Sequence, residues 1–376
     1  MTMEYSIFKD TIGQKGLQTY LSNRTFDAMY WPSLFPLKRV SKLDTTTLIG
    51  AKGHRVAADI TAYNAPAPVK RRPTVDKMTA EIPPIRIARQ MEETDLNEYY
   101  ALKAQADDQA QLSALELVFD DVLFCADGVR ARLEWLGLQA AMHGTVTWNA
   151  TNNEGAIIQT DVDFRLPAAN QEYIGSAGGT AAATHYWTAA VAATNDPIVD
   201  IQSICDEAAD GGSKIQYMLM NMSKWRDLRQ STAVQNFCRT YLIDGTAYRT
   251  YPRLDIMNDA LKQEGLPEII VIDTRVYVEV AGTYTAVDPW LYDNTYDRYV
   301  TFVPELPLGN MLYCPTAEEY APVKQAMYAK RDNILISKFR STNPVGEMTV
   351  GQMNAFPSWP SIDKAWILNT ESHTTF

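Results

Sequence analysis

The sequence predicts an α+β fold that combines one very long helix, a region of alternating helices and strands, and a tail of strands. Apolar residues recur at helical spacing over 112–140, helical and strand-like patterns alternate over 197–330, and residues 333–376 read as strands. Helical spacing places residues three and four apart on one face, whereas a strand alternates every second residue. A coiled coil is the alternative use of such a helix, but the strand-rich remainder of the chain argues against it.

Residues 1–42 are predicted to form an N-terminal arm. Two nearby prolines flank an aromatic-rich run, and prolines this close together break regular structure. We expect the arm to be extended and its aromatic side chains to anchor it to another element, although a surface loop of the same fold is the alternative. The anchors are Tyr30, Trp31 and Phe35.

Residues 43–90 read as two strands joined by a long, proline-stiffened loop, with strand patterns at 56–62 and 85–90. A two-stranded arm cannot bury both of its faces and is marginal alone, so we expect it to lie on a neighbouring element, either within the chain or on another copy. The tip carries three consecutive cations, Lys70, Arg71 and Arg72. This basic tip either pairs with the carboxylates of a partner or forms a solvated turn.

A short helix is expected to begin near Leu96, before the long helix at 112–140, which is roughly 40 Å long at about 1.5 Å per residue. Its predicted core face consists of Leu112, Leu115, Phe119, Val122, Val129, Leu133 and Leu136. The opposite face, which we expect to meet solvent or the basic loop of a neighbour, carries Glu116, Asp120, Asp127 and Glu134. Asp121 is expected among the charges of the same helix surface.

Residues 149–196 form the loosest region, and their glycine-rich stretch at 175–180 lacks the strand and the lysine of a phosphate loop. Asp196 and Pro197 then open a helix, as a capping residue and a first-turn proline do. We expect an α/β unit with helices at 197–210, 225–237 and 254–264, and strands at 215–220, 268–273, 276–280, 284–287, 299–303 and 310–314.

The tail contains three strand patterns, at 334–339, 345–353 and 365–368. Extending the α/β unit with these strands requires a long return path. We therefore expect all three to pair beside the long helix and to cover its apolar face.

The composition excludes several classes of protein. A net charge of −11 argues against a dedicated nucleic-acid binder, which needs a basic face, although a protein that only encloses nucleic acid does not. The four cysteines lie far apart, without disulfide or zinc spacing. No signal peptide and no apolar run of membrane-spanning length is present, so we expect no membrane association and a reducing compartment.

Motifs of catalysis are also missing. The chain has no G-x-G-x-x-G after a strand, no P-loop, no H-E-x-x-H and no G-x-S-x-G. The adjacent carboxylates Asp120 and Asp121 diverge on a helix, whereas an acid/base pair must converge. We therefore predict that the protein is not an enzyme and has no catalytic residues, no cofactor and no metal site.

Several stretches follow one another in an order that carries a family resemblance: 31–36, 126–129, 138–144, 161–164, 186–187, 196–201 and 308–311. This order resembles tailed-phage major capsid proteins with the Hong Kong 97-type fold, and among them the lambda-type major head protein, or capsid protein E, family. The likeness covers nearly the whole chain. Each stretch is short, so the specificity lies in their order.

The resemblance implies a division of the chain into four regions. Residues 1–42 form the N-terminal arm, and residues 43–90 form an extended β-hairpin loop that reaches over a neighbouring subunit. Residues 91–196 and 331–376 form a peripheral domain around a spine helix, and residues 197–330 form an α/β axial domain.

The resemblance also implies the function. Copies assemble as pentamers and hexamers of an icosahedral virion shell that encloses a double-stranded DNA genome without sequence-specific binding, and assembly takes place in the host cytoplasm. The partners are further copies of the chain, a portal and, because only about 40 residues precede the first strand, a separate scaffolding protein. A decoration protein is compatible with the resemblance.

Two other functions stay open at this stage. The first is an encapsulin-like compartment, which has the same fold and encloses an enzyme instead of DNA. The second is a soluble α/β enzyme, which forms no shell. Some family members crosslink a loop lysine to a neighbour, but nothing in the sequence identifies a partner for Lys70 or Lys77.

Overall fold

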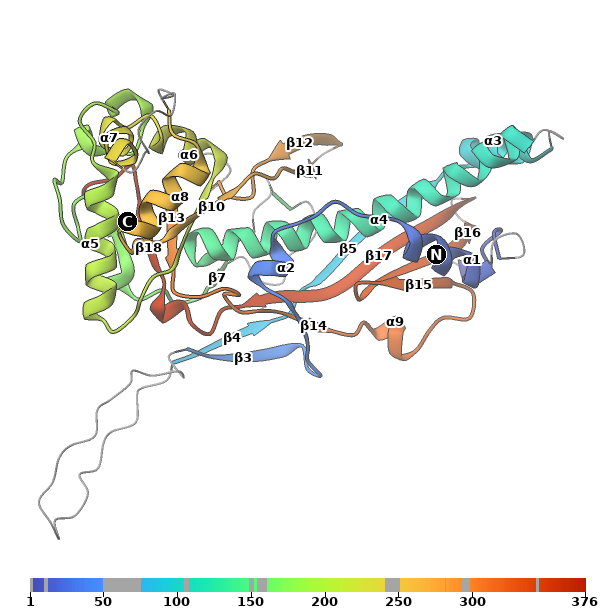
Figure 1. Ribbon diagram of the computed structural model, residues 1–376. Coiled ribbons are helices and arrows are strands. Elements are labelled where there is room, and N and C mark those ends of the chain that lie inside the picture. Colours follow the sequence, from blue (N-terminus) through green and yellow to red (C-terminus); the bar gives the residue numbers. More distant parts are fainter. Residues whose placement is uncertain are drawn as a thin grey trace, which may run out of the picture.

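A long helix, α4 (Asp108–His143), runs along most of the molecule (Figure 1). The computed structural model describes residues 3–9, 13–49, 76–104, 108–148, 152–153, 161–240, 251–280, 282–291, 298–342 and 345–376. At about 1.5 Å per residue the 36 residues of α4 span roughly 54 Å, which confirms the predicted long helix. The shorter helix α3 (Glu93–Ala104) precedes it, as predicted.

A seven-stranded sheet lies against α4. Its central strand β17 (Val345–Ser358) pairs antiparallel with β16 (Ile334–Thr342), β5 (Pro84–Met91) and β14 (Asn310–Cys314). The other members are β1 (Met3–Glu4), β2 (Leu37–Arg39) and β15 (Met327–Arg331). The first two tail strands therefore lie beside the long helix, as predicted, and together they bury a continuous apolar core.

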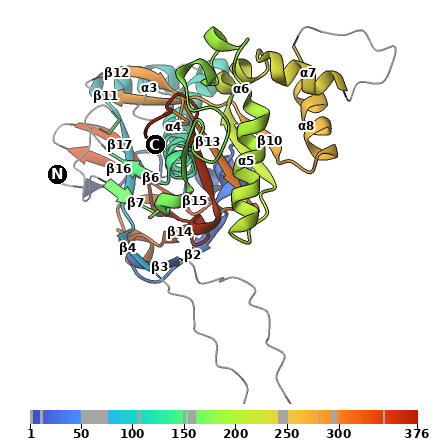
Figure 2. The ribbon, with the colours of Figure 1, turned by 90° about the vertical axis from the view of Figure 1, so that its left-hand side faces the viewer.

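The base of the predicted two-stranded arm projects from this sheet. Strand β3 (Asp44–Ile49) pairs antiparallel with β4 (Asp76–Glu81), and neither strand pairs with another described strand. Figure 2 shows the two strands at the lower edge of the body, near β2. The strand predicted at 56–62 and the basic tip lie outside the described residues, whereas the returning strand predicted at 85–90 is β5 of the large sheet.

A second, five-stranded sheet has its own apolar core. Its order is β10-β9-β13-β18-β8, and its strands are β8 (Gln171–Tyr173), β9 (Tyr217–Asn221), β10 (Glu268–Ile272), β13 (Tyr299–Val303) and β18 (Trp366–Asn369). The helices beside it are α5 (Pro197–Asp210), α6 (Met222–Leu228), α7 (Thr232–Thr240) and α8 (Leu254–Gln263). These elements confirm the predicted α/β unit, except that the helix expected over 225–237 is two helices.

The two sheets exchange strands, which corrects two predictions. Strand β14, expected in the α/β unit, pairs with β17 of the large sheet. Strand β18, expected beside the long helix, pairs with β13 and β8 of the five-stranded sheet. All four residues of β18 are buried, and a strand buried on both faces reads only as an apolar run, which does not reveal the sheet it joins.

Shorter elements complete the fold. Strands β11 (Val276–Val280) and β12 (Thr283–Val287) form the predicted hairpin, which lies over α4 (Figure 1). The arm contains α1 (Gly13–Asn23) and α2 (Trp31–Leu34), and α9 (Ala317–Tyr320) precedes β15. Strands β6 (Thr145–Thr147) and β7 (Asp161–Asp163) pair after α4. The 3-10 turns are Ala168–Asn170, Ala183–His185, Ala189–Val191 and Ile362–Lys364.

Candidate subunit-contact surfaces

The predicted anchors of the arm lie on the subunit's own long helix. The Trp31 and Phe35 side chains are buried, and Tyr30 is half-buried beside them. The carboxylate of Glu134 on α4 accepts hydrogen bonds from the main-chain N–H groups of Tyr30 and Trp31 at 3.0 and 2.8 Å. The expected extended run is therefore wrong at α2, where Pro32 occupies the first helical turn, a position that tolerates proline.

Glu134 also corrects the predicted solvent face of α4. Its side chain is 1 % exposed, because the arm covers it, and burial raises the pKa of its carboxyl while the two N–H donors oppose the shift. Helical spacing places a residue on a face but does not reveal that the arm returns to cover that face.

The predicted core face of α4 is buried where its side chains are described. Val122, Val129, Leu133 and Leu136 are buried, and Phe119 is half-buried and stacks on Tyr20 with ring centroids 3.9 Å apart. Leu112 and Leu115 lie in a stretch of α4 whose side chains are outside the described residues.

A buried charge cluster connects α4 to the large sheet. Lys338 of β16 is fully buried, its ammonium nitrogen lies 3.8 Å from the carboxylate of Asp121, and it donates to the Thr349 hydroxyl at 2.9 Å. Arg89 of β5 also contacts Asp121, at 3.3 Å, and the buried Glu347 adds a second carboxylate. Burial raises the pKa values of both carboxyls and lowers the pKa of Lys338.

Asp121 is thus not the surface charge that the sequence predicts. It is 5 % exposed, and its cationic partners come from strands far away in the sequence. Taking such a group out of water is unfavourable unless opposite charges and hydrogen bonds compensate.

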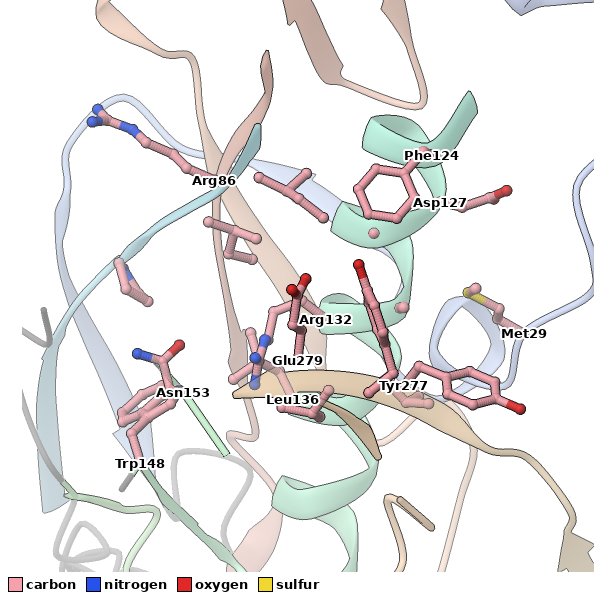
Figure 3. Close-up of a pocket in the computed structure, with 18 of the residues that line it drawn as sticks. Met29, Arg86, Phe124, Asp127, Arg132, Leu136, Trp148, Asn153, Tyr277 and Glu279 are labelled. Atoms are coloured by element: carbon pink, nitrogen blue, oxygen red, sulfur yellow. The ribbon is translucent and has the colours of Figure 1, made fainter. Parts of the chain in front are cut away.

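A groove of about 1100 Å³ lies between α4, the start of β5 and the hairpin β11–β12 (Figure 3). Its floor includes Phe124 and Leu136 of α4, and Ile85 of β5 forms part of one wall. Arg132 from α4 and Glu279 from β11 project into it. The groove combines apolar walls with charged groups of both signs.

Arg132 is the most unusual group in this groove. One guanidinium nitrogen, Nη2, donates to the main-chain oxygen of Asn152 at 3.0 Å, while Nη1 is buried without a hydrogen-bond partner among the described residues. Burial lowers the pKa of Arg132. A buried donor without an acceptor costs about 1–3 kcal/mol, and more when it is charged.

The hairpin exposes two aromatic side chains at the rim of the groove. Tyr277 is 70 % exposed and Tyr284 is 60 % exposed, while Val276 and Val278 point into the protein. Tyr284 pairs across the hairpin with Glu279, and the hydrogen bond between them raises the pKa of Tyr284. The sequence analysis did not identify Arg132 or these tyrosines, although the alternation of valine with polar residues in β11 marks the exposed face.

The described residues offer little for catalysis. They contain no group of three or more His, Cys, Asp or Glu side chains placed to hold a metal ion. Burial raises the pKa values of Cys125, Cys205 and Cys238 to about 11, so these thiols stay protonated at neutral pH. No described helix combines the length and the apolar character of a membrane span.

Comparison with family models identifies one family, and solved structures share the fold. The family model described as "Phage major capsid protein E" matches residues 20–369. A solved protein assigned as the capsid protein of a prophage of E. coli CFT073 is similar, with a TM-score of 0.56, 15 % identity, and coverage of 95 % of this chain and 98 % of that chain. A phage-related protein of Bordetella bronchiseptica RB50 has a TM-score of 0.50, 12 % identity and complete coverage of both chains. No curated protein sequence matches the chain.

Proposed function

Because the chain belongs to the phage major capsid protein E family, we propose that its copies assemble as pentamers and hexamers of an icosahedral shell around a double-stranded DNA genome. The chain is a structural shell protein of the virion with the Hong Kong 97-type capsid fold. The observation that carries the proposal is the family match from residue 20 to residue 369, which leaves no separate catalytic domain between those positions. The same match favours a phage shell over an encapsulin-like compartment, and a structural over an enzymatic role.

We assign the four regions of the subunit as the resemblance implies them. These are the arm at 1–42, the extended loop at 43–90, the peripheral domain at 91–196 and 331–376, and the axial domain at 197–330. The structure adds that strands β14 and β18 cross between the two domains, so the two units share strands. In this assignment α4 is the spine helix.

The extended loop is proposed to contact a neighbouring subunit. Its base, β3–β4, pairs with no other described strand, and two strands alone are marginally stable in water. The hydroxyl groups of Thr47 and Ser358 lie 2.8 Å apart and connect this base to β17 of the large sheet. In a chain of net charge −11, the tip residues Lys70, Arg71 and Arg72 are suited to an acidic patch on a neighbour.

The partners of the assembled shell are proposed from the same family relationship. They are further copies of the chain, a scaffolding protein and a portal, with assembly in the host cytoplasm, and a decoration protein is compatible with this relationship. Many weak contacts per copy then add up through multivalency. An acidic chain of this kind encloses DNA without binding a particular sequence.

Electron microscopy tests the proposed function. The chain is expressed with and without the product of the gene next to it, and the particles are imaged by negative stain. We expect capsomers or closed shells. A uniform small oligomer that never assembles under either condition contradicts the proposal.

A charge reversal tests the role of the loop tip. The double substitution Arg71→Glu with Arg72→Glu is expected to block assembly while the subunit stays folded, because the contact with an acidic patch becomes repulsive. The matched control, Arg71→Lys with Arg72→Lys, keeps both charges and is expected to assemble. Normal particles from the charge-reversed chain rule out this role for the tip.

A further inference from the structure

The groove beside the spine helix contains an unsatisfied donor. Arg132 Nη1 is buried without an acceptor among the described residues, although Arg132 lies on the most regular element of the fold. Arg130, on the same helix, makes a similar bond, since its Nη2 donates to the main-chain oxygen of Asp27 at 3.0 Å, but it does not line the groove. The unsatisfied donor therefore belongs to the groove and is not a general property of arginines on α4.

Strand edges border the same groove. Among the described strands β5 pairs only with β17, and the residues at its start, from Pro83 to Ile87, line the groove. On the other side, β11 and β12 pair with each other and with no further strand of the described residues. Unpaired main-chain groups along a strand edge accept an extended segment of another chain.

The exposed residues at the rim also have the character of a protein contact. Tyrosine and arginine are enriched at interfaces, where an aromatic ring buries a large area and a guanidinium supplies several donors. Tyr277, Tyr284 and Arg132 all line the groove, and the two tyrosines are exposed. A small-molecule pocket is instead mostly apolar and encloses its ligand, whereas charged groups of both signs enter this groove from its walls.

We propose that this groove is a subunit contact of the shell, in which a segment of a second copy of the chain lies between α4, β5 and the hairpin, and supplies an oxygen acceptor to Arg132 Nη1. The proposal rests on the proposed shell function, because only an assembly places a further copy beside every groove. The hairpin tyrosines then pack on that copy. The contact satisfies the buried donor that the described part of the subunit leaves unpaired.

Site-specific crosslinking tests which chain occupies the groove. Tyr277 is replaced by the photoreactive residue p-benzoylphenylalanine, and this variant is assembled as a minor fraction among wild-type copies carrying a heavy nitrogen isotope. Crosslinked peptides of mixed isotope composition then identify contacts between different copies. We expect such peptides from irradiated shells and none from unassembled subunits. A parallel series at Tyr320, which is exposed away from the groove, reports the crosslinking that exposure alone produces.

The outcomes separate this proposal from the function on which it rests. Shells whose crosslinks at position 277 are absent, or no more frequent than those at position 320, overturn the groove contact and leave the shell function intact. Crosslinks to a scaffolding or decoration protein assign the groove to that partner and also overturn it. A wild-type chain that forms no shell removes the shell function and this contact together.

A substitution pair tests the role of Arg132. Arg132→Met keeps the aliphatic stem and removes the guanidinium, and Arg130→Met does the same outside the groove. Each substitution removes one hydrogen bond to a main-chain oxygen inside the subunit. We expect Arg132→Met to weaken subunit association by roughly tenfold or more beyond the effect of Arg130→Met, while the unfolding midpoint of the unassembled subunit falls no further for Arg132→Met than for Arg130→Met, because the first substitution also removes a buried unsatisfied donor. Equal effects on association show that Arg132 has only a role inside the subunit.

Discussion

Gly351 of β17 lies directly against the main chain of Cys125 in the spine helix. A Cβ atom at position 351 would stand 2.6 Å from the carbonyl oxygen of Cys125 and 3.1 Å from its Cβ atom. The thiol of Cys125 also donates to the Thr349 oxygen at 3.5 Å. At this point helix and sheet approach so closely that only a residue without a side chain fits between them.

Gly351→Ala is expected to lower the free energy of unfolding by about 1–3 kcal/mol, because main-chain atoms cannot move aside as a flexible side chain can. Gly128→Ala is the matched control. The new Cβ there meets the flexible end of Ile87, and the gain in helix propensity of about 1 kcal/mol offsets the contact. Urea unfolding of the unassembled subunits measures the free energy of unfolding of both variants. Equal losses of this free energy contradict the close approach of helix and sheet at Gly351.

Lys338→Met is expected to destabilise the subunit by about 3–5 kcal/mol, since Glu347 and Asp121 lose their shared buried cation and Asp121 keeps only the half-exposed Arg89. Combining it with Glu347→Gln removes one of the uncompensated charges and is expected to recover part of the loss. Unfolding midpoints in urea compare the three chains. If Lys338→Met alone lowers the unfolding midpoint no more than the double substitution does, Lys338 does not compensate the charge of Glu347.

Glu172 is expected to make stability depend on pH. Burial and the neighbouring Glu207 raise its pKa from 4.5 to about 7, while a hydrogen bond from Ser176 opposes the shift. Between these two values the folded state binds more protons than the unfolded state, so this contribution to stability grows as the pH falls from 7 towards 4.5. Each unit of pKa difference corresponds to about 1.4 kcal/mol.

Burial lowers the pKa of His143 to about 4, so its contribution to stability falls as the pH drops below its ordinary value of 6.5. Because His143 is present in both proteins, comparing wild type with Glu172→Gln isolates the contribution of Glu172. Thermal unfolding is measured from pH 7.5 to 4.5. We expect the stability of the wild type relative to the variant to rise as the pH falls. The substitution Asp206→Asn, at an exposed carboxylate, serves as the control for the loss of one acidic side chain. Parallel profiles for Glu172→Gln and wild type exclude a raised pKa at Glu172.

A chain that ends after Asp332 is expected to give no soluble subunit, because it lacks β16 and β17, which cover the apolar face of α4. A chain that ends after Glu371 keeps all the strands and is expected to stay soluble with a lower midpoint. It loses the hydrogen bond from Ile174 to Ser372 and the stacking of Phe376 on His143. The soluble fraction after expression and circular dichroism measure both, and a soluble, helical chain ending at 332 supports a self-sufficient coiled coil instead.

The sequence predicts elements better than it predicts their partners. Local spacing is enough for α4, and the capping of α5 by Asp196 appears in the structure as its side chain accepting from Val199 at 3.4 Å. The helix over 225–237 divides at Ser231, whose buried hydroxyl donates to the Asn195 oxygen at 3.4 Å, a partner that no local pattern reveals. Glu134 and Asp121 are misplaced for the same reason, since segments far away in the sequence cover them.

The position of β18 has a consequence for protein synthesis. It lies between β13 and β8, inside the five-stranded sheet, although both of those strands precede it in the chain. While the ribosome makes residues 1–365, this sheet has a vacant central place and two open strand edges. A nascent chain therefore cannot complete the five-stranded sheet before residue 369 has emerged. Truncated products expose this unfinished sheet to the cell's proteases and chaperones.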